Sequence, residues 1–560
     1  MSEFEVISAK RKRLTESGEV PEWYTTQGLL MFERKYAFNG ETVRESFLRV
    51  ANHLGALVPE MEGAKQKFFD LMWSGKLAPS TPVLCNVGTG RGHPVSCSGG
   101  FIGDSIDEFY KNHHENAMLS KKGYGTSSYL GSIRPRGDKI SSGGEADGVI
   151  PQFDSAIDVV RKVSQGNNRR GNWAGYLEVD HEDFYELAGY VQKNPASANV
   201  GWIFKDAFIE RLVAGEKDAV DRFNKVCYLR ARSGKGYIWK SDTANKLSPQ
   251  AIKNSGITIK GSNLCSEIAL PQDADHTFSC VLSSINLLMW DSIEDEDIEW
   301  MIVFLDAVVT EMLNLAKGHS GFERIVRFTE KSRALGLGTL GLHSYFQSKM
   351  LPFDSFDARL LNTAIYSRIQ KCAIRSSQNL AKVYGEPEWC KGTGMRNATT
   401  MAIAPNTSSA LLCGGVSQSI EPLVTNAFNQ PTAAGEMTRM NPQLVETLKE
   451  KGIFSVALMK DLAMNFKGSV QHMTELTEHE KLVFRTAFEI DQMSLVQMAS
   501  SRQRFIDQGQ SLNLFFSEDE VEIAGVIKAI LLDEYIKGAY YQRSMRGATG
   551  STGDCLACEG

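Results

Sequence analysis

The sequence lacks a long hydrophobic run. No stretch of about 18 apolar residues occurs among its 560 residues, so no membrane-spanning helix is expected. Its first residues, Met1-Ser2-Glu3-Phe4-Glu5, also lack the basic-then-apolar order of a secretory signal. Together the two absences predict a cytoplasmic protein, in a compartment where thiols stay reduced.

An excess of positive charge is missing as well. The net charge is −6, so no nucleic-acid partner is expected, and the short basic run Lys10–Arg13 is interpreted as part of a solvated tail. A hydrophobic content of 42% and a charged content of 23% are typical of a globular protein. The length predicts either one large enzyme domain with helical additions or several domains.

No internal repeat divides the chain. Residues 1–20 are polar and predict a flexible N-terminal tail, and residues 546–560 are predicted to form a flexible C-terminal tail. Apolar residues at helical spacing predict helices over 41–75 and 297–317. Short β-rich runs alternate with helices over several hundred residues, which favours an α/β fold, either an open sheet or a barrel.

The ten cysteines need a reason other than structural disulfides in a reducing compartment. Cys555 and Cys558 form a CxxC pair near the end of the chain, which is typical of either a metal site or a redox dithiol. A four-cysteine zinc site would need a second close pair, and the sequence has none. We therefore favour a dithiol that swings on its tail to exchange with a disulfide elsewhere.

A second motif is Ser262–Glu267, in which Asn263, Cys265 and Glu267 alternate with other residues. On an extended or looped backbone these three side chains share one face, around one small volume. A thiol beside an amide and a carboxylate can support redox or radical chemistry. The plain alternative is a cysteine in a polar loop.

Cys97 and Cys280 have small polar neighbours that would let a ligand approach the backbone. Taken singly, each is more typical of a structural cysteine. Taken with Cys265 and the tail pair, they predict a reaction that draws two electrons from a dithiol and uses a third thiol separately.

With these motifs in this order, the chain resembles the large, catalytic subunit of ribonucleotide reductase from about residue 20 to its end. The matching segments are Ser80-Thr81-Pro82, Val95-Ser96-Cys97, Gly103-Asp104-Ser105, Arg134–Gly137, Ser164-Gln165-Gly166, Asn263–Glu267, Ala404–Ser409, Tyr540-Tyr541 and the terminal CxxC. The resemblance implies a mainly helical region over 21–95. It also implies, over 96–545, a ten-stranded α/β barrel of two five-stranded halves with Cys265 on a loop inside it.

The resemblance also implies residue roles. Cys265 would hold the thiyl radical that abstracts the ribose 3′ hydrogen, Glu267 would act as base on the 3′ hydroxyl, and Asn263 would bind substrate hydroxyls. Cys97 and Cys280 would reduce the substrate and end as a disulfide. Cys555 and Cys558 would reduce that disulfide, with thioredoxin or glutaredoxin as their own reductant.

Binding sites follow from the same resemblance. The substrate would be held by Thr81, Ser96, Asn406, Thr407, Ser408 and Ser409, although a helix cap is the plain reading of residues 405–409. A deoxynucleoside triphosphate effector would bind Asp104, Ser105 and Arg134 at a homodimer interface. Residues 192–199 match the loop that links effector to substrate choice, in a shorter form without its arginines.

Tyr540 and Tyr541 favour the class I form of the family. Such a pair relays oxidation from a separate ferritin-like small subunit, whose metal cofactor generates the radical, so no cofactor is expected in this chain. The alternatives are an adenosylcobalamin-dependent reductase, an inactive nucleotide-binding paralogue and a CxxC redox carrier. The short N-terminus implies a compact form without the ATP cone, of a kind found in bacteria and their viruses.

Residues 336–341 spell GxGxxG, which can mark a dinucleotide site. Such a site needs a preceding strand and an acidic residue about 20 positions later. The preceding segment is helix-like and Leu361 is not acidic. We interpret these glycines instead as a barrel strand with close backbone packing.

Overall fold

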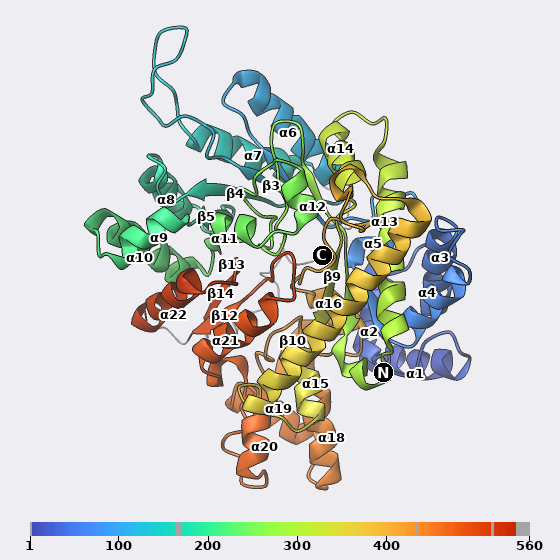
Figure 1. Ribbon diagram of the computed structural model, residues 1–560. Coiled ribbons are helices and arrows are strands. Elements are labelled where there is room, and N and C mark those ends of the chain that lie inside the picture. The colour runs from blue at the N-terminus through green and yellow to red at the C-terminus, as the bar shows by residue number, and fades with distance from the viewer. Residues whose placement is uncertain (1–2, 164–170, 433–434, 517–519, 545–560) are drawn as a thin grey trace.

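The computed structural model describes residues 3–163, 171–432, 435–516 and 520–544. Its β-sheets occupy the middle of the molecule, with the N-terminal helices on one side and α8–α10 on the opposite side (Figure 1). The tail cysteines Cys555 and Cys558 and the segment Ser164–Gly166 lie outside the described residues.

The N-terminal region is helical, as predicted, but it begins earlier than expected. Its helices are α1 (Glu3–Glu16), α2 (Thr26–Met31), α3 (Val43–Gly55), α4 (Ala64–Trp73) and α5 (Thr81–Asn86), with a π-turn at Phe32–Tyr36. The predicted flexible tail over 1–20 is wrong, because α1 packs Ile7 and Leu14 against the core and Arg11 Nη1 donates to Tyr24 O at 3.0 Å. The predicted helix over 41–75 is two helices, since Gly63 takes a left-handed conformation (φ +79°) before α4.

A seven-stranded sheet carries much of the predicted site. In spatial order its strands are β13 (Gly538–Ala539), β6 (Tyr237–Trp239), β5 (Val200–Ile203), β4 (Trp173–Glu178), β3 (Gly125–Tyr129), β2 (Cys97–Phe101) and β7 (Phe278–Cys280). Strands β2 to β6 are mutually parallel, whereas β13 and β7 pair antiparallel at the two edges. Parallel neighbours need crossover connections. Here these contain α6 (Ile106–Lys121), α7 (Ile150–Lys162), α8 (Phe184–Lys193), α9 (Asp206–Val213) and α10 (Lys217–Ser233).

Both faces of this sheet are buried, and alternate residues separate two hydrophobic clusters. Trp173, Leu177 and Ile238 pack outward with the crossover helices. Tyr176 and Tyr237, from the same strands, pack inward with Cys97 and Cys265. Because side chains alternate along a strand, hydrocarbon and indole side chains point outward, whereas the phenols point inward to the cysteines.

The remaining strands form smaller sheets. They are β1 (Leu77–Pro79), β8 (Leu282–Asn286) and β9 (Gly336–Leu340) in one sheet, β12 (Leu514–Phe516) with β14 (Gln542–Ser544), and the hairpin β10 (Ala427–Thr432) with β11 (Gly435–Met440). An isolated parallel bridge joins Ile403 to Gln510. The α/β class is confirmed, while the division into two five-stranded halves stays a prediction.

Strand β9 is the GxGxxG segment, and its interpretation as a closely packed strand is confirmed. A Cβ on Gly336 would lie 2.3 Å from Leu282 Cδ2, and one on Gly338 would lie 2.7 Å from Ala402 O. Both glycines therefore let neighbouring strands approach, and neither opens a phosphate-binding turn.

Further helices complete the molecule. They are α11 (Ser241–Lys246), α12 (Gln250–Asn254), α13 (Asp295–Ala316), α14 (Glu323–Ser332), α15 (Leu342–Ser348), α16 (Phe356–Tyr384), α17 (Thr407–Leu412), α18 (Pro442–Glu450), α19 (Val456–Asn465), α20 (Glu478–Val483), α21 (Gln492–Gln503) and α22 (Glu520–Leu532). Helix α13 confirms the prediction over 297–317. Helices α18 to α20 form a lobe with its own small hydrophobic cluster (Figure 1).

Candidate active site

The loop that contains Asn263, Cys265 and Glu267 lies between α12 and β7, and its residues 261–272 are all buried. The exposed fractions of these three residues are 0%, 5% and 1%. Within the loop Ser266 takes a left-handed conformation (φ +63°), which is unusual for a residue other than glycine and occurs where surrounding contacts impose it. The backbone is thus a tight turn, the looped form of the two backbones that the sequence left open.

Neighbouring elements hold this turn by its backbone carbonyls. Ser127 Oγ donates to Ser262 O at 2.7 Å, Tyr176 OH donates to Asn263 O at 2.7 Å, and Ser511 Oγ donates to Cys265 O at 2.6 Å. In addition, Gly509 N donates to Glu267 O at 2.7 Å. The position of Cys265 is therefore set by strands β3 and β4 and by the segment after α21.

The side-chain amide oxygen of Asn263 stabilises the turn through hydrogen bonds to its backbone. Its Oδ1 accepts from the backbone N–H groups of Glu267 at 3.1 Å and Ile268 at 3.2 Å. Its Nδ2 is buried and makes no hydrogen bond of normal geometry with the part of the chain that the structure describes. A buried amide N–H without an acceptor is costly, so this group is suited to bind a ligand oxygen.

Glu267 is a buried carboxyl group with a strongly perturbed pKa. Burial raises its pKa to about 8, and the nearby Cys97 adds to this effect. The Asn263 amide and Ser511, whose Oγ lies 3.1 Å from Glu267 Oε2, partly oppose it. A carboxyl with a pKa near neutrality can exchange a proton with a substrate hydroxyl at physiological pH.

Cys97 and Cys280 are directly paired across the antiparallel strands β2 and β7. Cys97 is 3% exposed and belongs to the same inner cluster as Cys265. Gly125 leaves space between Cys97 and Leu264, since a Cβ there would lie 3.0 Å from Leu264 Cδ2 and 3.7 Å from Cys97 Sγ.

The two adjacent tyrosines lie in this same interior. The Tyr540 and Tyr541 ring centroids are 4.1 Å apart, with Tyr540 fully buried and Tyr541 partly buried. Tyr540 N donates to Leu512 O, and Tyr541 N donates to Asn513 Oδ1 at 3.0 Å. The segment 511–513 therefore supports both the tyrosines and, through Ser511, the Cys265 turn.

The predicted substrate residue Asn406 and Ser80, which precedes Thr81, both contact β8, while Thr81 Oγ1 lies 2.8 Å from Tyr36 OH. Ser80 N donates to Ser283 Oγ at 3.4 Å, and Asn406 Nδ2 donates to Ser284 Oγ at 2.8 Å. The Asn406 amide also donates to Thr339 O, so its side chain braces the loop.

Around them, Thr407, Ser408 and Ser409 begin α17, where Thr407 Oγ1 donates to Gln418 Oε1 at 3.3 Å. Ser409 Oγ is buried without a partner among the described residues. Ser96 is buried immediately before β2.

The predicted effector residues also meet in space. Arg134 Nε donates to Asp104 Oδ2 at 2.6 Å, and Ser105 Oγ caps α6 by accepting from Glu108 N at 3.3 Å. Asp104 and Ser105 immediately precede α6, and Arg134, which follows β3, joins them through its bond to Asp104. Residues 192–199 comprise the last two residues of α8 and the segment that leads to β5, where Asn199 Nδ2 donates to Trp173 O at 3.1 Å.

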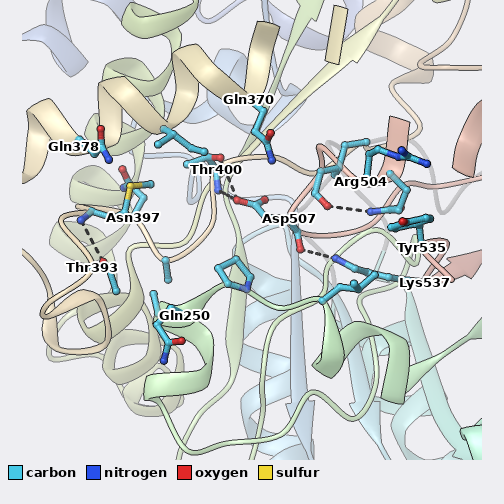
Figure 2. A pocket seen from close by; sticks show the side chains of 18 residues that line it. Gln250, Gln370, Gln378, Thr393, Asn397, Thr400, Arg504, Asp507, Tyr535 and Lys537 are labelled. Atoms are coloured by element: carbon cyan, nitrogen blue, oxygen red, sulfur yellow. Dashed lines mark hydrogen bonds between the residues drawn. The ribbon is translucent and has the colours of Figure 1, made fainter. Parts of the chain in front are cut away.

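A cavity of about 490 Å³ lies beside the segment that supports the Cys265 turn, and none of the predicted site residues lines it (Figure 2). Asp507 in its wall accepts from Met401 N at 2.8 Å and from Thr400 Oγ1 at 3.1 Å. Lys537 Nζ donates to Gln508 O at 2.6 Å. These contacts fix Asp507 and Gln508, which precede Gly509, and Lys537, which lies three residues before Tyr540.

Several site residues were not singled out from the sequence. They are Ser127, Tyr176, Tyr237, Ser511 and Asn513. Each is an ordinary strand or loop residue whose importance depends on contacts with distant segments, so no local signal marks it. Among the described residues, no cluster of His, Cys, Asp or Glu could hold a metal ion, and no helix is long and apolar enough to span a membrane.

Comparisons with known proteins agree on one family. The sequence matches the family profile "Ribonucleotide reductase, barrel domain" over residues 95–220, 215–393 and 387–541, and "Ribonucleotide reductase, all-alpha domain" over residues 22–92. The structure is similar to that of the Actinobacillus ureae class Id ribonucleotide reductase alpha subunit, with a TM-score of 0.86 and 36% identity, covering 96% of this chain and 99% of that one.

Two viral proteins are similar over nearly their whole length. A protein of Frog virus 3 (isolate Goorha), named provisionally as a ribonucleoside-diphosphate reductase large subunit, is 33% identical over 90% of this chain and 95% of its own. The ribonucleoside-diphosphate reductase large subunit of Invertebrate iridescent virus 3 is 30% identical over 89% of this chain and 92% of its own.

Proposed function

This chain belongs to the ribonucleotide reductase large-subunit family, and from that premise we propose how its residues reduce a ribonucleotide. As a member of that family it is an oxidoreductase that makes 2′-deoxyribonucleotides for DNA synthesis, with a radical supplied by a separate small subunit. The relatives' names favour ribonucleoside diphosphates as substrates.

Cys265 begins the reaction. Once oxidised to a thiyl radical, it abstracts the 3′ hydrogen of the ribose and returns it at the end of the reaction, which regenerates the radical. A cysteine thiol suits this step because its S–H bond is similar in strength to a ribose C–H bond. Glu267 takes the 3′-hydroxyl proton, for which its raised pKa suits it. The buried Asn263 Nδ2, which also interacts with the Glu267 carboxyl, donates to a substrate hydroxyl.

Cys97 and Cys280 then provide the reducing equivalents. The 2′ hydroxyl leaves as water, the two thiols supply two electrons and two protons, and the sulfur atoms join as a disulfide. The observation that carries this proposal is the β2–β7 register, which pairs Cys97 with Cys280 beside the buried Cys265 turn. Cys555 and Cys558 would reduce the disulfide and pass on electrons from thioredoxin or glutaredoxin.

The substrate phosphates are assigned to the start of α17 with Thr81 and Ser96. Asn406 braces this loop, while Thr407, Ser408 and Ser409 present hydroxyls and backbone N–H groups. Tyr540 and Tyr541 would relay oxidation from the ferritin-like small subunit toward Cys265.

The effector site is assigned to Asp104, Ser105 and Arg134 in a homodimer. Ile106 and Tyr110, one turn apart on α6, are each 71% exposed and form an apolar strip beside these residues. Replacing both by glutamate is expected to convert a dimer to a monomer in analytical ultracentrifugation. Val521→Glu, at a site that is 82% exposed on α22, is the matched control and should leave the dimer intact.

The function is tested by CDP reduction with the purified chain, a ferritin-like small subunit and dithiothreitol. We expect dCDP only when both subunits are present. Activity of the chain alone with adenosylcobalamin would contradict the class I assignment. The double substitution Cys555→Ser with Cys558→Ser should stop thioredoxin-driven turnover and spare turnover with dithiothreitol; equal loss with both reductants would contradict the role of the tail.

A further inference from the structure

A third tyrosine lies against the adjacent pair. In the antiparallel pairing of β6 with β13, Ile238 is opposite Ala539, so the next residue on each strand brings Tyr237 beside Tyr540. Their ring centroids are 5.0 Å apart. Because Ile238 packs outward, Tyr237 points into the inner cluster that contains Cys265.

Tyr237 also contacts the second member of the pair. Its ring lies edge-on to that of Tyr541, with centroids 5.6 Å apart and planes at 78°. The Tyr237 hydroxyl donates to the Tyr541 hydroxyl oxygen at 3.5 Å. One side chain thus contacts both members of the pair, through its ring and through its hydroxyl.

The surroundings keep Tyr237 a hydrogen-bond donor. Its side chain is fully buried, and burial raises its pKa well above the ordinary value, with further increases from Tyr541, Cys265 and Tyr176. The Arg230 guanidinium lies near Tyr237. It donates to Gly236 O, just before β6, and to Tyr540 O at 2.9 Å, and so links β6 to the segment that contains Tyr540 and Tyr541.

We propose that Tyr237 is a positioning residue for the tyrosine relay, which holds the Tyr541 phenol by a hydrogen bond and packs Tyr540 in place without carrying an electron itself. The inference rests on the relay assigned under the proposed function. A phenol oxygen that accepts a hydrogen bond bears negative charge more easily. The Tyr237 hydroxyl therefore lowers the pKa of the phenol at position 541.

The contact can be tested on the large subunit alone. With 3-nitrotyrosine in place of Tyr541, the phenol is titrated by its visible absorbance, with and without Tyr237→Phe. Losing a hydrogen bond to an ionised oxygen should raise the pKa at position 541 by about one unit. An unchanged titration would overturn the proposal.

Tyr124→Phe is the matched control. Tyr124 is also buried, and its hydroxyl pairs with His93 Nδ1 at 3.0 Å in another part of the core. This variant should leave the titration at position 541 unmoved. A shift equal to that of Tyr237→Phe would indicate a general loosening of the fold and would overturn the assignment.

The role in the relay is tested in the two-subunit enzyme. Tyr237→Phe should lower CDP reduction about three- to tenfold, as expected for the loss of one hydrogen bond. With 3-aminotyrosine at position 237, no radical should accumulate there during turnover; an aminotyrosyl radical at that position would overturn a positioning role. Because the titration needs neither turnover nor a small subunit, a failure of the proposed function is distinguishable from a failure of this inference.

Discussion

The two faces of the seven-stranded sheet are equally buried but do different work. The outer face packs Trp173, Leu177 and Ile238 under the crossover helices. The inner face presents Tyr176 and Tyr237 from the same strands. Burial alone therefore does not separate core from active site; the difference lies in the groups that the strands present, hydrocarbon and indole side chains on the outer face and phenols beside thiols on the inner face.

The largest expected effect is on the inner face. Cys265→Ala should abolish CDP reduction, because no other group at this position can hold the radical. Unfolding by urea should change by only about 1 kcal/mol, the ordinary cost of a small substitution. Cys227→Ala is the matched control on α10, in the outer cluster, and should keep its turnover. Loss of turnover in both variants would erase the contrast between the faces.

The next effect concerns Glu267. Glu267→Gln should lower turnover about 10²- to 10⁴-fold, the usual range for a general base. In the unsubstituted enzyme the ionised fraction of a group with a pKa of about 8 rises about tenfold per pH unit below that value. Turnover should therefore rise with pH and level off above about 8; a flat profile from pH 6 to 9 would contradict the role as base.

The same carboxyl links stability to pH. Its folded-state pKa of about 8 lies above its ordinary value of 4.5, so the folded protein retains a proton that the unfolded chain releases between these values. The free energy of unfolding contributed by this group then falls as pH rises through that window. Glutamine does not ionise, so Glu267→Gln removes this decrease in the free energy of unfolding. Relative to the unsubstituted protein, the variant should therefore be more stable at pH 8 than at pH 5, as measured by urea unfolding at the two pH values.

On the outer face the expected effect is on stability. Leu177→Ala should reduce the free energy of unfolding by about 2–5 kcal/mol, because it leaves a cavity under the crossover helices. Turnover per folded molecule should change little, since the inner face of β4 is untouched. The result is checked by urea unfolding together with CDP reduction at a temperature where the variant is folded. A large loss of turnover would show that the outer packing sets the site geometry.

The smallest effect is expected at the neighbouring inner residue. Tyr176→Phe removes the hydrogen bond to Asn263 O and should cost about 1 kcal/mol of unfolding free energy. Turnover should fall several-fold, because the Cys265 turn loses one of its supports. Equal stability and full turnover in this variant would show that Ser127 and Ser511 hold the turn without it.

Much of the site could be predicted from local sequence. The alternation around Cys265, the CxxC tail and the tyrosine pair are short-range patterns whose chemistry depends on residue type. The turn conformation at Ser266 was not predictable, because it depends on hydrogen bonds from β3, β4 and the segment after α21. Helix α1 was missed for a related reason: the packing of Ile7 and Leu14 stabilises a segment that is polar by composition.

By itself, the sequence determined which groups are candidates to react: a thiol between an amide and a carboxylate, two further cysteines and two adjacent tyrosines. Only the tertiary structure decided that Cys97 lies opposite Cys280, that Glu267 is buried enough to raise its pKa, and that Tyr237 donates to Tyr541. The physical reason is range. Chemical identity is local, whereas strand register, burial and hydrogen-bond partners depend on segments up to hundreds of residues apart.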